Sequence, residues 1–310
     1  MNESRSDNRD EKLYNTDSDL SSRFGPGDQR GNLNYIDSRK VLEALRIPQS
    51  GRVYRMSHEL FNGMADRPTH GPYFFDILLR PCDGGFTEKY DNRYGPSLGR
   101  LEMSDHTGTH LDALSHMAYD GKFFNNVPVK DVITNTGYAR MGIENAGPIV
   151  TRGIMVDAAG YAGTDLLDGG TPVEVSDVQK FLKDNNIIPE PGDAMFFHTG
   201  ASILFSKPEK YDKFYDSAPG IGFRLARYLN DIGISITGSD TPSSEVVPPE
   251  SKNTRLPVHQ YLIAKAGIHI IDNLSLHRMA KDRIYKFMFV CSPVPFKGAT
   301  ASPVSPVAII

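Results

Sequence analysis

Three histidines and an aspartate fall within one short stretch of this chain, from His106 to His116. If the stretch is extended, its side chains alternate between two faces, so that His106, His110 and Asp112 share one face. A helix would bring the two histidines together but would turn the aspartate away from them. Gly108 lies between the histidines and has no Cβ that would resist a bend. We therefore predict a strand bent at Gly108, with His106, His110 and Asp112 on its concave side.

These donors have the chemistry of a divalent metal site. Two imidazoles and a carboxylate suit zinc, manganese or iron(II), and they leave coordination positions open for water. Such an ion lowers the pKa of its water toward ~7 and supplies hydroxide at neutral pH. His116 lies just beyond the three donors, where it is either a fourth ligand or a residue that moves a proton between water and a leaving group.

The elements that must position these donors alternate between strand and helix. Apolar, branched or aromatic runs predict strands, and apolar residues at helical spacing predict helices. This alternation is typical of an α/β fold, and we expect one domain over residues 25–300. The predicted strands cover residues 72–79, 153–156, 194–197, 234–238, 268–271 and 284–290, and the predicted helices cover residues 41–46, 175–182, 223–232 and 259–265.

The two ends of the chain differ from this central part. Residues 1–24 are polar and charged, so we predict a flexible N-terminal arm. Residues 301–310 are predicted to form a C-terminal tail, which is either loose or docked in an extended conformation.

Composition narrows the classes of partner. The chain has 310 residues, with 34 Lys plus Arg against 38 Asp plus Glu and a net charge of −4, which offers no electrostatic footprint for nucleic acid or an anionic membrane. No apolar run reaches the roughly 18 to 20 residues of a membrane-spanning helix. The polar N-terminus lacks the apolar region of a secretory signal, and two distant cysteines, Cys82 and Cys291, do not resemble a disulfide framework. We expect a cytoplasmic protein that takes a small-molecule substrate.

The run from His106 to His116 resembles the histidine signature of the cyclase family of metal-dependent hydrolases, which includes bacterial kynurenine formamidase and isatin hydrolase. Further blocks resemble the longer branch of that family, in consistent order over residues 24–295. The resemblance implies a single α/β domain around a barrel-like β-sheet core with flanking helices, and a homodimer. The blocks are FGPGDQRGNLN (24–34), YDGK (119–122), PGD (191–193), PGIG (219–222), GSDT (238–241) and DNL (272–274).

The resemblance also implies roles at the matching positions. His106, His110 and Asp112 would hold a first metal ion, and His116 would be the catalytic proton-transfer residue. Leu114 stands where the formamidase-type branch often has proline, a difference that concerns the shape of the pocket rather than its chemistry.

In members with two metal ions, a later histidine and an acid complete the second site. The matching positions here are His259 and Asp272, with Asp112 as the bridge. The acid is usually glutamate, and Asp272 is shorter. Because some members work with one ion, we expect one zinc or manganese ion and leave the second open.

The expected activity is hydrolysis of an amide, lactam or ester bond of a small, aromatic or cyclic substrate by metal-activated water. One alternative is an iron(II) oxygenase that uses His110, Asp112 and His259, although it gives His106 and His116 no role. Another is a metal-binding relative without activity, against which the retention of every ligand argues.

Other residues are weaker candidates. Phe75, Phe123 and His198 are candidates for the substrate pocket, although the two phenylalanines also suit an ordinary core and His198 a hydrogen-bonded structural position. Asp240 and the segment Ser243–Glu245 follow a predicted strand, where they either reach the substrate or form a turn.

Overall fold

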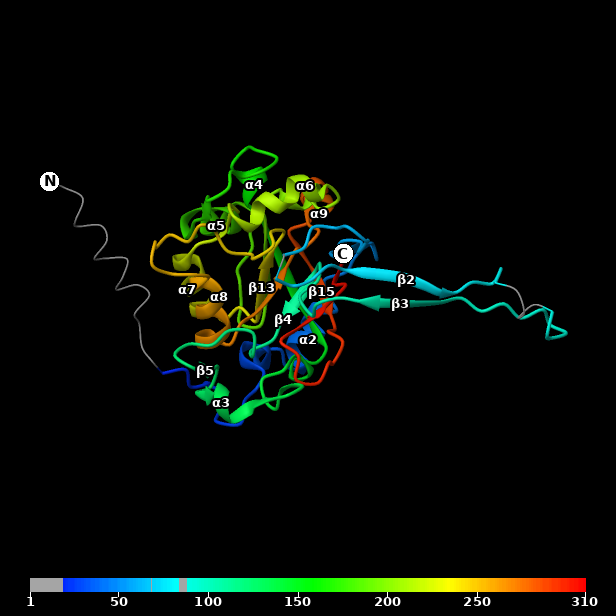
Figure 1. Cartoon of the computed structure of the whole chain (residues 1–310). Helices are drawn as coiled ribbons and strands as arrows, with labels where there is room; N and C mark the ends of the chain where they lie inside the picture. Colours follow the sequence, from blue (N-terminus) through cyan, green and yellow to red (C-terminus); the bar gives the residue numbers. More distant parts are fainter. Residues whose placement is uncertain (1–18, 68, 84–87) are drawn as a thin grey trace.

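Four parallel strands form the centre of the fold in the computed structural model, which describes residues 19–67, 69–83 and 88–310 (Figure 1). They are β9 (Ile149–Asp157), β11 (Ala194–His198), β13 (Ile236–Ser239) and β14 (His269–Asp272). Each pairs in parallel with the next. The segments between them contain helices, as parallel neighbours require. The predicted α/β architecture is therefore confirmed.

Antiparallel strands extend this centre on both sides into a nine-stranded sheet. The order is β1-β17-β15-β9-β11-β13-β14-β4-β16. The added strands are β15 (Lys286–Cys291), β17 (Val307–Ile309) and β1 (Val53–Arg55) on one side, and β4 (His110–Asp112) and β16 (Ala301–Pro303) on the other.

The C-terminal segment closes the sheet into a barrel-like shape. Strands β16 and β17 follow one another along the chain, yet they lie near opposite ends of the strand order. The connection between Pro303 and Val307 spans at most about 14 Å, so the two ends of the sheet must curl toward each other. Backbone hydrogen bonds from Val304 to Thr109 (2.9 Å) and from Met56 to Pro306 (2.8 Å) tie the connection to both ends.

The same observation corrects the expected C-terminal boundary. Residues 301–310 are not a tail beside the domain, because six of them are strand residues of its main sheet. Of the two alternatives considered, docking in an extended conformation is the one observed. The expected N-terminal arm falls mostly on residues 1–18, which lie outside the described residues.

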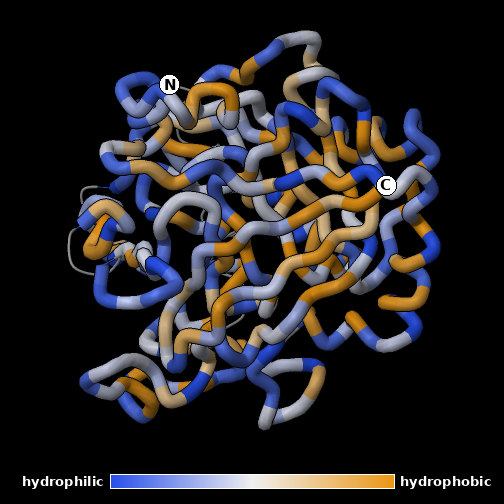
Figure 2. Tube along the Cα trace, turned by 90° about the vertical axis from the view of Figure 1, so that its right-hand side faces the viewer, coloured by the Kyte–Doolittle hydropathy of each residue, from blue (hydrophilic) through white to orange (hydrophobic). Residues whose placement is uncertain are grey.

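Helices cover one face of the parallel strands, and the curled sheet encloses the other. Alternate strand residues fill two cores: Ile154 and Val156 pack on the helix side, and Met155 packs on the enclosed side. Strands buried on both faces have continuous apolar sequences, and Figure 2 shows hydrophobic residues along the strands that cross the middle of the molecule. The covering helices are α5 (Val175–Asp184), α7 (Phe223–Asp231) and α8 (Pro257–His259), which continues into the π-helical segment η5 (Gln260–Ala266).

Shorter elements complete the body. The predicted helix around residues 41–46 is α2 (Ser38–Ala44), which the Asp37 side chain caps by accepting the Lys40 backbone N–H at 2.8 Å. The remaining elements are η1 (Gly31–Tyr35), α2 (Ser38–Ala44), β5 (Lys122–Phe123), β6 (Val127–Pro128), α3 (Val129–Val132), β7 (Ile133–Thr134), β8 (Gly137–Tyr138), η2 (Ile143–Asn145), α4 (Ala158–Tyr161), β10 (Pro172–Val173), η3 (Ala201–Leu204), α6 (Pro208–Tyr211), η4 (Asp212–Tyr215), β12 (Gly220–Ile221) and α9 (His277–Lys281).

One hairpin leaves the body. Strands β2 (Phe74–Leu79) and β3 (Leu98–Glu102) pair with each other and extend away from the barrel (Figure 1). In the part of the chain that the structure describes, no helix is both long enough and apolar enough to span a bilayer.

Candidate metal centre

The histidine stretch folds as a turn followed by a short strand. His110 and Asp112 lie on β4, and His106 lies in the turn before it. Gly108 has φ +60°, and a Cβ there would collide with Leu60, so the bend requires glycine. The predicted bend at Gly108 is confirmed. The prediction of strand structure from 106 to 109 is wrong, because the left-handed residue reverses the chain and carries the His106 ring back over β4.

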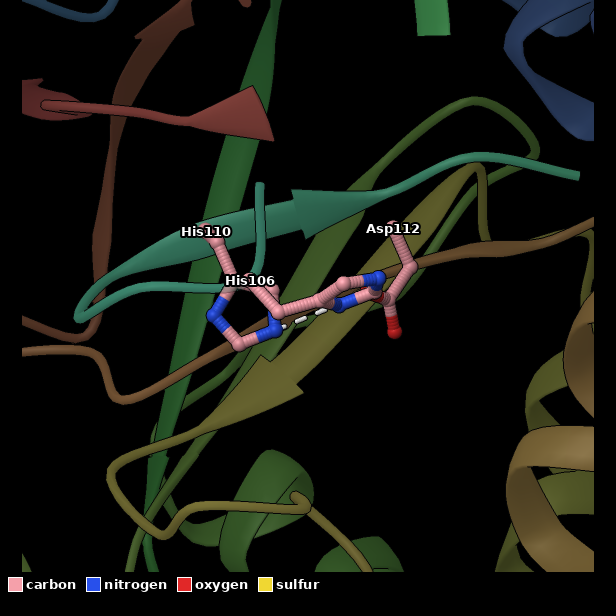
Figure 3. Close-up of side chains that lie close together, drawn as sticks. All are labelled: His106, His110 and Asp112. Atoms are coloured by element: carbon pink, nitrogen blue, oxygen red, sulfur yellow. Dashed lines mark ion pairs between the residues drawn. The ribbon is translucent and has the colours of Figure 1, made fainter. Parts of the chain in front are cut away.

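This turn brings the first three donors together. The possible ligand atoms of His106, His110 and Asp112 lie within 4.8 Å of one another. His106 Nδ1 is 3.1 Å and His110 Nε2 is 3.5 Å from Asp112 Oδ1. In Figure 3 both imidazoles point toward the Asp112 carboxylate.

A second group of donors shares Asp112. The possible ligand atoms of Asp112, His259 and Asp272 also lie within 4.8 Å of one another. His259 Nε2 is 3.7 Å from Asp112 Oδ2 and 3.5 Å from Asp272 Oδ2. The strand register explains why Asp272 lies close to the first group, because β14 pairs antiparallel with β4 and sets Asp272 directly opposite His110. The structure therefore brings all five residues predicted for the two ions into one buried cluster.

Backbone and carboxylate acceptors determine which nitrogen of two histidines carries hydrogen. His110 Nδ1 donates to the Gly108 carbonyl at 2.8 Å, and His259 Nδ1 donates to Glu245 Oε1 at 2.6 Å. In the neutral imidazoles, Nε2 then presents a lone pair to the cluster. Such an outer hydrogen bond is the usual way in which a metal-binding histidine is oriented.

His106 is oriented by a relay. The Thr300 hydroxyl donates its only hydrogen to Asp105 Oδ2 at 2.8 Å. It must then accept from His106 Nε2, which lies 2.9 Å away. In neutral His106, Nδ1 therefore carries no hydrogen and faces the Asp112 carboxylate with its lone pair.

The Asp112 carboxylate supplies the test of whether a cation fits. Both of its oxygens are buried, and neither has a hydrogen-bond partner among the described residues. Burial opposes ionisation, but His116 and His106 hold the pKa of Asp112 well below its usual range. A buried charge without hydrogen bonds is costly unless a cation compensates it. The donor set and the unpartnered oxygens fit a divalent ion between the imidazoles and the carboxylate.

Two histidines of the cluster bind protons more tightly than a free imidazole does. Burial opposes protonation of His106, but the Asp112 carboxylate, 3.1 Å from its Nδ1, raises its pKa. Burial likewise opposes protonation of His259, but Asp272 and Glu245 raise its pKa well above the usual value. Binding of a metal would displace these protons, which is the usual coupling between metal affinity and pH.

His116 differs from the other histidines of the cluster. It follows β4, its side chain is 25% exposed, and its Nε2 lies 4.0 Å from Asp112 Oδ2. Burial lowers its pKa to about 4, against the attraction of Asp112. His116 is therefore neutral at pH 7 and able to accept a proton. Another histidine, His70, has its ring 5.6 Å from that of His106.

Sequence reasoning missed several residues that support the donors. Thr300 was missed because it follows the histidine stretch by almost 200 residues and meets it only when β16 pairs with β4. Glu245 has a weak sequence signal, since it is an acid that follows a predicted strand. Ser244, beside it, donates to Asp272 Oδ1 at 2.6 Å and leaves Oδ2 facing the cluster.

Asn273 is another supporting residue; it lies in the DNL block, but the sequence assigns it no role. Its Nδ2 donates to the Gly108 carbonyl at 2.9 Å, and its Oδ1 accepts from the Tyr211 hydroxyl at 2.7 Å. The carbonyl that orients His110 is thus itself fixed to the end of β14.

The residues predicted for the substrate pocket lie in three separate places. Phe75 lies on the projecting hairpin, and Phe123 is buried in the core with its ring 5.0 Å from that of Tyr138. His198 Nδ1 lies 2.7 Å from Asp157 Oδ1. In the described part of the chain, no hydrogen bond, ion pair or ring contact joins these three to the cluster, so their pocket roles stay predictions.

Asp240 lies in a bend directly after β13. It is fully buried and accepts hydrogen bonds from the backbone N–H groups of residues 199, 200 and 202. Its carboxylate therefore holds the segment that follows β11.

Comparison of the sequence with known proteins agrees with the geometry. A family model described as "Putative cyclase" matches residues 54–246. Kynurenine formamidase from Bacillus cereus (strain ZK / E33L) is 27% identical over 251 residues, covering 80% of this chain and 93% of that protein. Kynurenine formamidase from Bacillus mycoides (strain KBAB4) is 26% identical over 251 residues, with the same coverage.

Solved structures show the same fold. A protein described as a novel cyclase superposes with a TM-score of 0.84 at 25% identity, covering 93% of this chain and 98% of that one. Isatin hydrolase A from Ralstonia solanacearum superposes with a TM-score of 0.61 at 15% identity, covering 83% and 91%. Since the family model spans more than half of the sequence, this chain belongs to the cyclase family.

Proposed function

We propose that this protein is a metal-dependent hydrolase that cleaves the carbon–nitrogen bond of a small amide or lactam, with esters and lactones as further substrates. The observation that carries the proposal is the buried Asp112 carboxylate, whose two unpartnered oxygens face the nitrogens of three oriented histidines. The names of its relatives, kynurenine formamidase and isatin hydrolase, support an aromatic N-acyl or cyclic amide as the substrate.

The proposed ions are zinc or manganese, which suit a mixture of imidazole and carboxylate donors. His106, His110 and Asp112 would hold the first ion, and His259 and Asp272 would hold a second one together with Asp112. We propose the second ion because its donors are as closely grouped and as firmly oriented as those of the first. A bound divalent ion supplies a water of lowered pKa and polarises the scissile carbonyl.

His116 is the proposed proton-transfer residue. It borders the cluster, remains partly exposed and is the one histidine of the 106–116 run that neither three-donor group includes. In this role it takes a proton from the attacking water and delivers it to the leaving nitrogen.

The test combines metal content with activity. Purified protein is loaded with zinc or manganese, its metal content is measured, and hydrolysis of an N-formyl anilide, a benzo-fused lactam and an aryl ester is followed with and without oxygen. We expect two ions per chain and anaerobic, metal-dependent hydrolysis of at least one amide. Turnover that requires oxygen would favour the iron(II) oxygenase instead. A metal-loaded protein without any turnover would favour the inactive relative.

A further inference from the structure

The Asp272 carboxylate has only one of its two oxygens free for the metal centre. Its Oδ1 accepts a hydrogen bond from the Ser244 hydroxyl at 2.6 Å, and its Oδ2 lies 3.5 Å from His259 Nε2. Carboxylates bind metals through one oxygen or through both, and a hydrogen bond from the scaffold orients them. The contact with Ser244 therefore favours binding through Oδ2 alone.

The direction of the Ser244 hydroxyl is fixed by a second hydrogen bond. Its oxygen accepts the backbone N–H of Ser239 at 2.8 Å, so its one hydrogen remains to be donated. Two acceptors lie within reach, the Asp272 carboxylate at 2.6 Å and the Ile271 carbonyl at 3.2 Å. The shorter bond to a charged acceptor is the stronger one. The hydroxyl is therefore directed at Asp272 Oδ1.

The backbone around Ser244 holds this side chain in place. Ser244 is fully buried, and its φ of +50° lies in the left-handed region. A residue other than glycine keeps such a conformation only where its surroundings impose it. Here the Ser244 carbonyl accepts the Ile221 backbone N–H at 2.8 Å, and Glu245 forms a parallel bridge with Ile221. The hydroxyl is thus a fixed part of the wall behind Asp272.

The other members of the second donor group (Asp112, His259 and Asp272) also supply one atom each. Asp112 Oδ2 lies 3.7 Å from His259 Nε2, whereas Asp112 Oδ1 faces the first group, 3.1 Å from His106 Nδ1. His259 Nδ1 donates to Glu245, so only Nε2 is available. The protein therefore offers three donor atoms to the second ion. Three protein donors and a water form the four-coordinate arrangement of catalytic zinc, whereas manganese prefers an octahedral set rich in oxygen.

We propose that Ser244 determines the metal preference of the second donor group, because its hydroxyl keeps the protein at three donor atoms and so favours zinc over manganese. Since Ser244 acts at the second ion of the proposed function, this role depends on that ion being bound. Once Oδ1 is released, Asp272 can bind through both oxygens, and the fourth protein donor reduces the discrimination against manganese. Ser244 acts through Asp272 and is a positioning residue.

The test compares zinc and manganese in Ser244→Ala. Competition titration with a chelator gives the affinity of each metal for both ions, and the second ion is identified as the one lost in His259→Ala. We expect the preference of the second ion for zinc over manganese to fall by about 10-fold in Ser244→Ala, with the first ion unchanged. Ser244→Gly should give the same result, because glycine adopts a positive φ without strain and so keeps the turn.

The matched control is Thr241→Val. Thr241 is a buried residue of the same turn, and its hydroxyl lies 2.8 Å from that of Ser239 rather than against a metal ligand. This variant should keep the wild-type metal preference. Cobalt(II) provides a second readout, because four-coordinate cobalt absorbs visible light more strongly than six-coordinate cobalt. The visible absorption of the cobalt-loaded protein should weaken in both Ser244 variants and not in the control.

Four results would overturn the proposal. Equal weakening of zinc and manganese by Ser244→Ala would mean that the hydroxyl only keeps Asp272 in place. An unchanged preference in both Ser244 variants would remove the hydroxyl from metal choice, and an equal shift in Thr241→Val would assign the effect to the whole turn. A wild type that binds one ion would leave Ser244 without this role. Hydrolysis by such a one-ion protein would still support the proposed activity, so the two failures are distinguishable.

Discussion

The two donor groups of the metal centre are built in opposite ways. His106, His110 and Asp112 lie within seven residues, and one turn at Gly108 brings them together. His259 and Asp272 lie more than 140 residues further along the chain and reach Asp112 only because the sheet and α8 place them there. The first group depends on local backbone geometry and the second on the whole fold. Asp112 belongs to both and joins them.

Both groups nevertheless follow one rule of orientation. In each histidine of the two donor groups, the other ring nitrogen is held by the scaffold: a backbone carbonyl for His110, a hydroxyl for His106 and a carboxylate for His259. The local and the distant group therefore differ in how the fold brings their donors together, but not in how their histidine rings are oriented. Substitutions can separate these two properties.

Replacing the shared ligand should have the largest effect. Asp112→Asn removes the charge that both groups use, so we expect loss of both ions and of all measurable hydrolysis. Metal analysis of the purified variant checks this result. Asp231→Asn, at an exposed position on α7, is the control and should keep both. An Asp112→Asn protein that still holds two ions would show that the groups do not share this ligand.

Replacing His116 should separate chemistry from metal binding. His116→Ala leaves both donor groups intact, so metal content should stay at the wild-type level while kcat falls by roughly 10²-fold or more. Steady-state kinetics at matched metal loading provides the measurement, with the exposed His277→Ala as control. Full activity of His116→Ala would remove it from the proposed mechanism.

The distant group should depend on Glu245. Glu245→Gln places an amide N–H group against one of the backbone donors at residues 258 and 259 and weakens the hold on His259. We expect the affinity for one of the two ions to fall by roughly 10- to 100-fold, with the other unchanged. Competition titration with a chelator resolves the two ions. Equal weakening of both ions would mean that the groups are not independent.

The smallest effect is expected at Thr300. Thr300→Val keeps the shape of the side chain but removes the acceptor of His106 Nε2, so this imidazole is free to protonate its other nitrogen. We expect affinity for the ion of the local group to fall by about 10-fold. Thr300→Ser keeps the hydroxyl and should restore the affinity. If valine and serine behave alike, the relay through Asp105 does not orient His106.

The sequence predicted the parts of this protein whose causes are local. Strands such as 153–156 and 194–197 were predictable because they are buried on both faces and are apolar throughout. The pairing of His110 with Asp112 was predictable from residue parity, and Gly108 indicated a bend. His106 joins them through the turn rather than by parity. The turn over 106–109 could not be predicted, because the sequence does not show whether a glycine adopts a left-handed or an extended conformation.

Features that depend on distant pairing could not be predicted in the same way. Residues 301–310 contain two prolines and little apolar periodicity, so nothing local marks them as strands of the main sheet. Their pairing with β4 also determines that Thr300 lies beside His106. The aromatic run at 72–79 correctly predicted a strand, observed as β2 at 74–79, but it gave no indication that the strand would project from the body.

The three-residue connection between β16 and β17 has a consequence for the order in which the molecule unfolds. Strand β16 pairs with β4, and Thr300 directly precedes it. The C-terminal segment that closes the barrel therefore also supports His106. Edge strands and loops open locally at lower free energy than the core. We expect a chelator that removes the ion of the local group to free His106, so that the segment joining β16 to β17 unfolds first. Limited proteolysis should then cut near residues 298–306 while the helices and parallel strands are still folded.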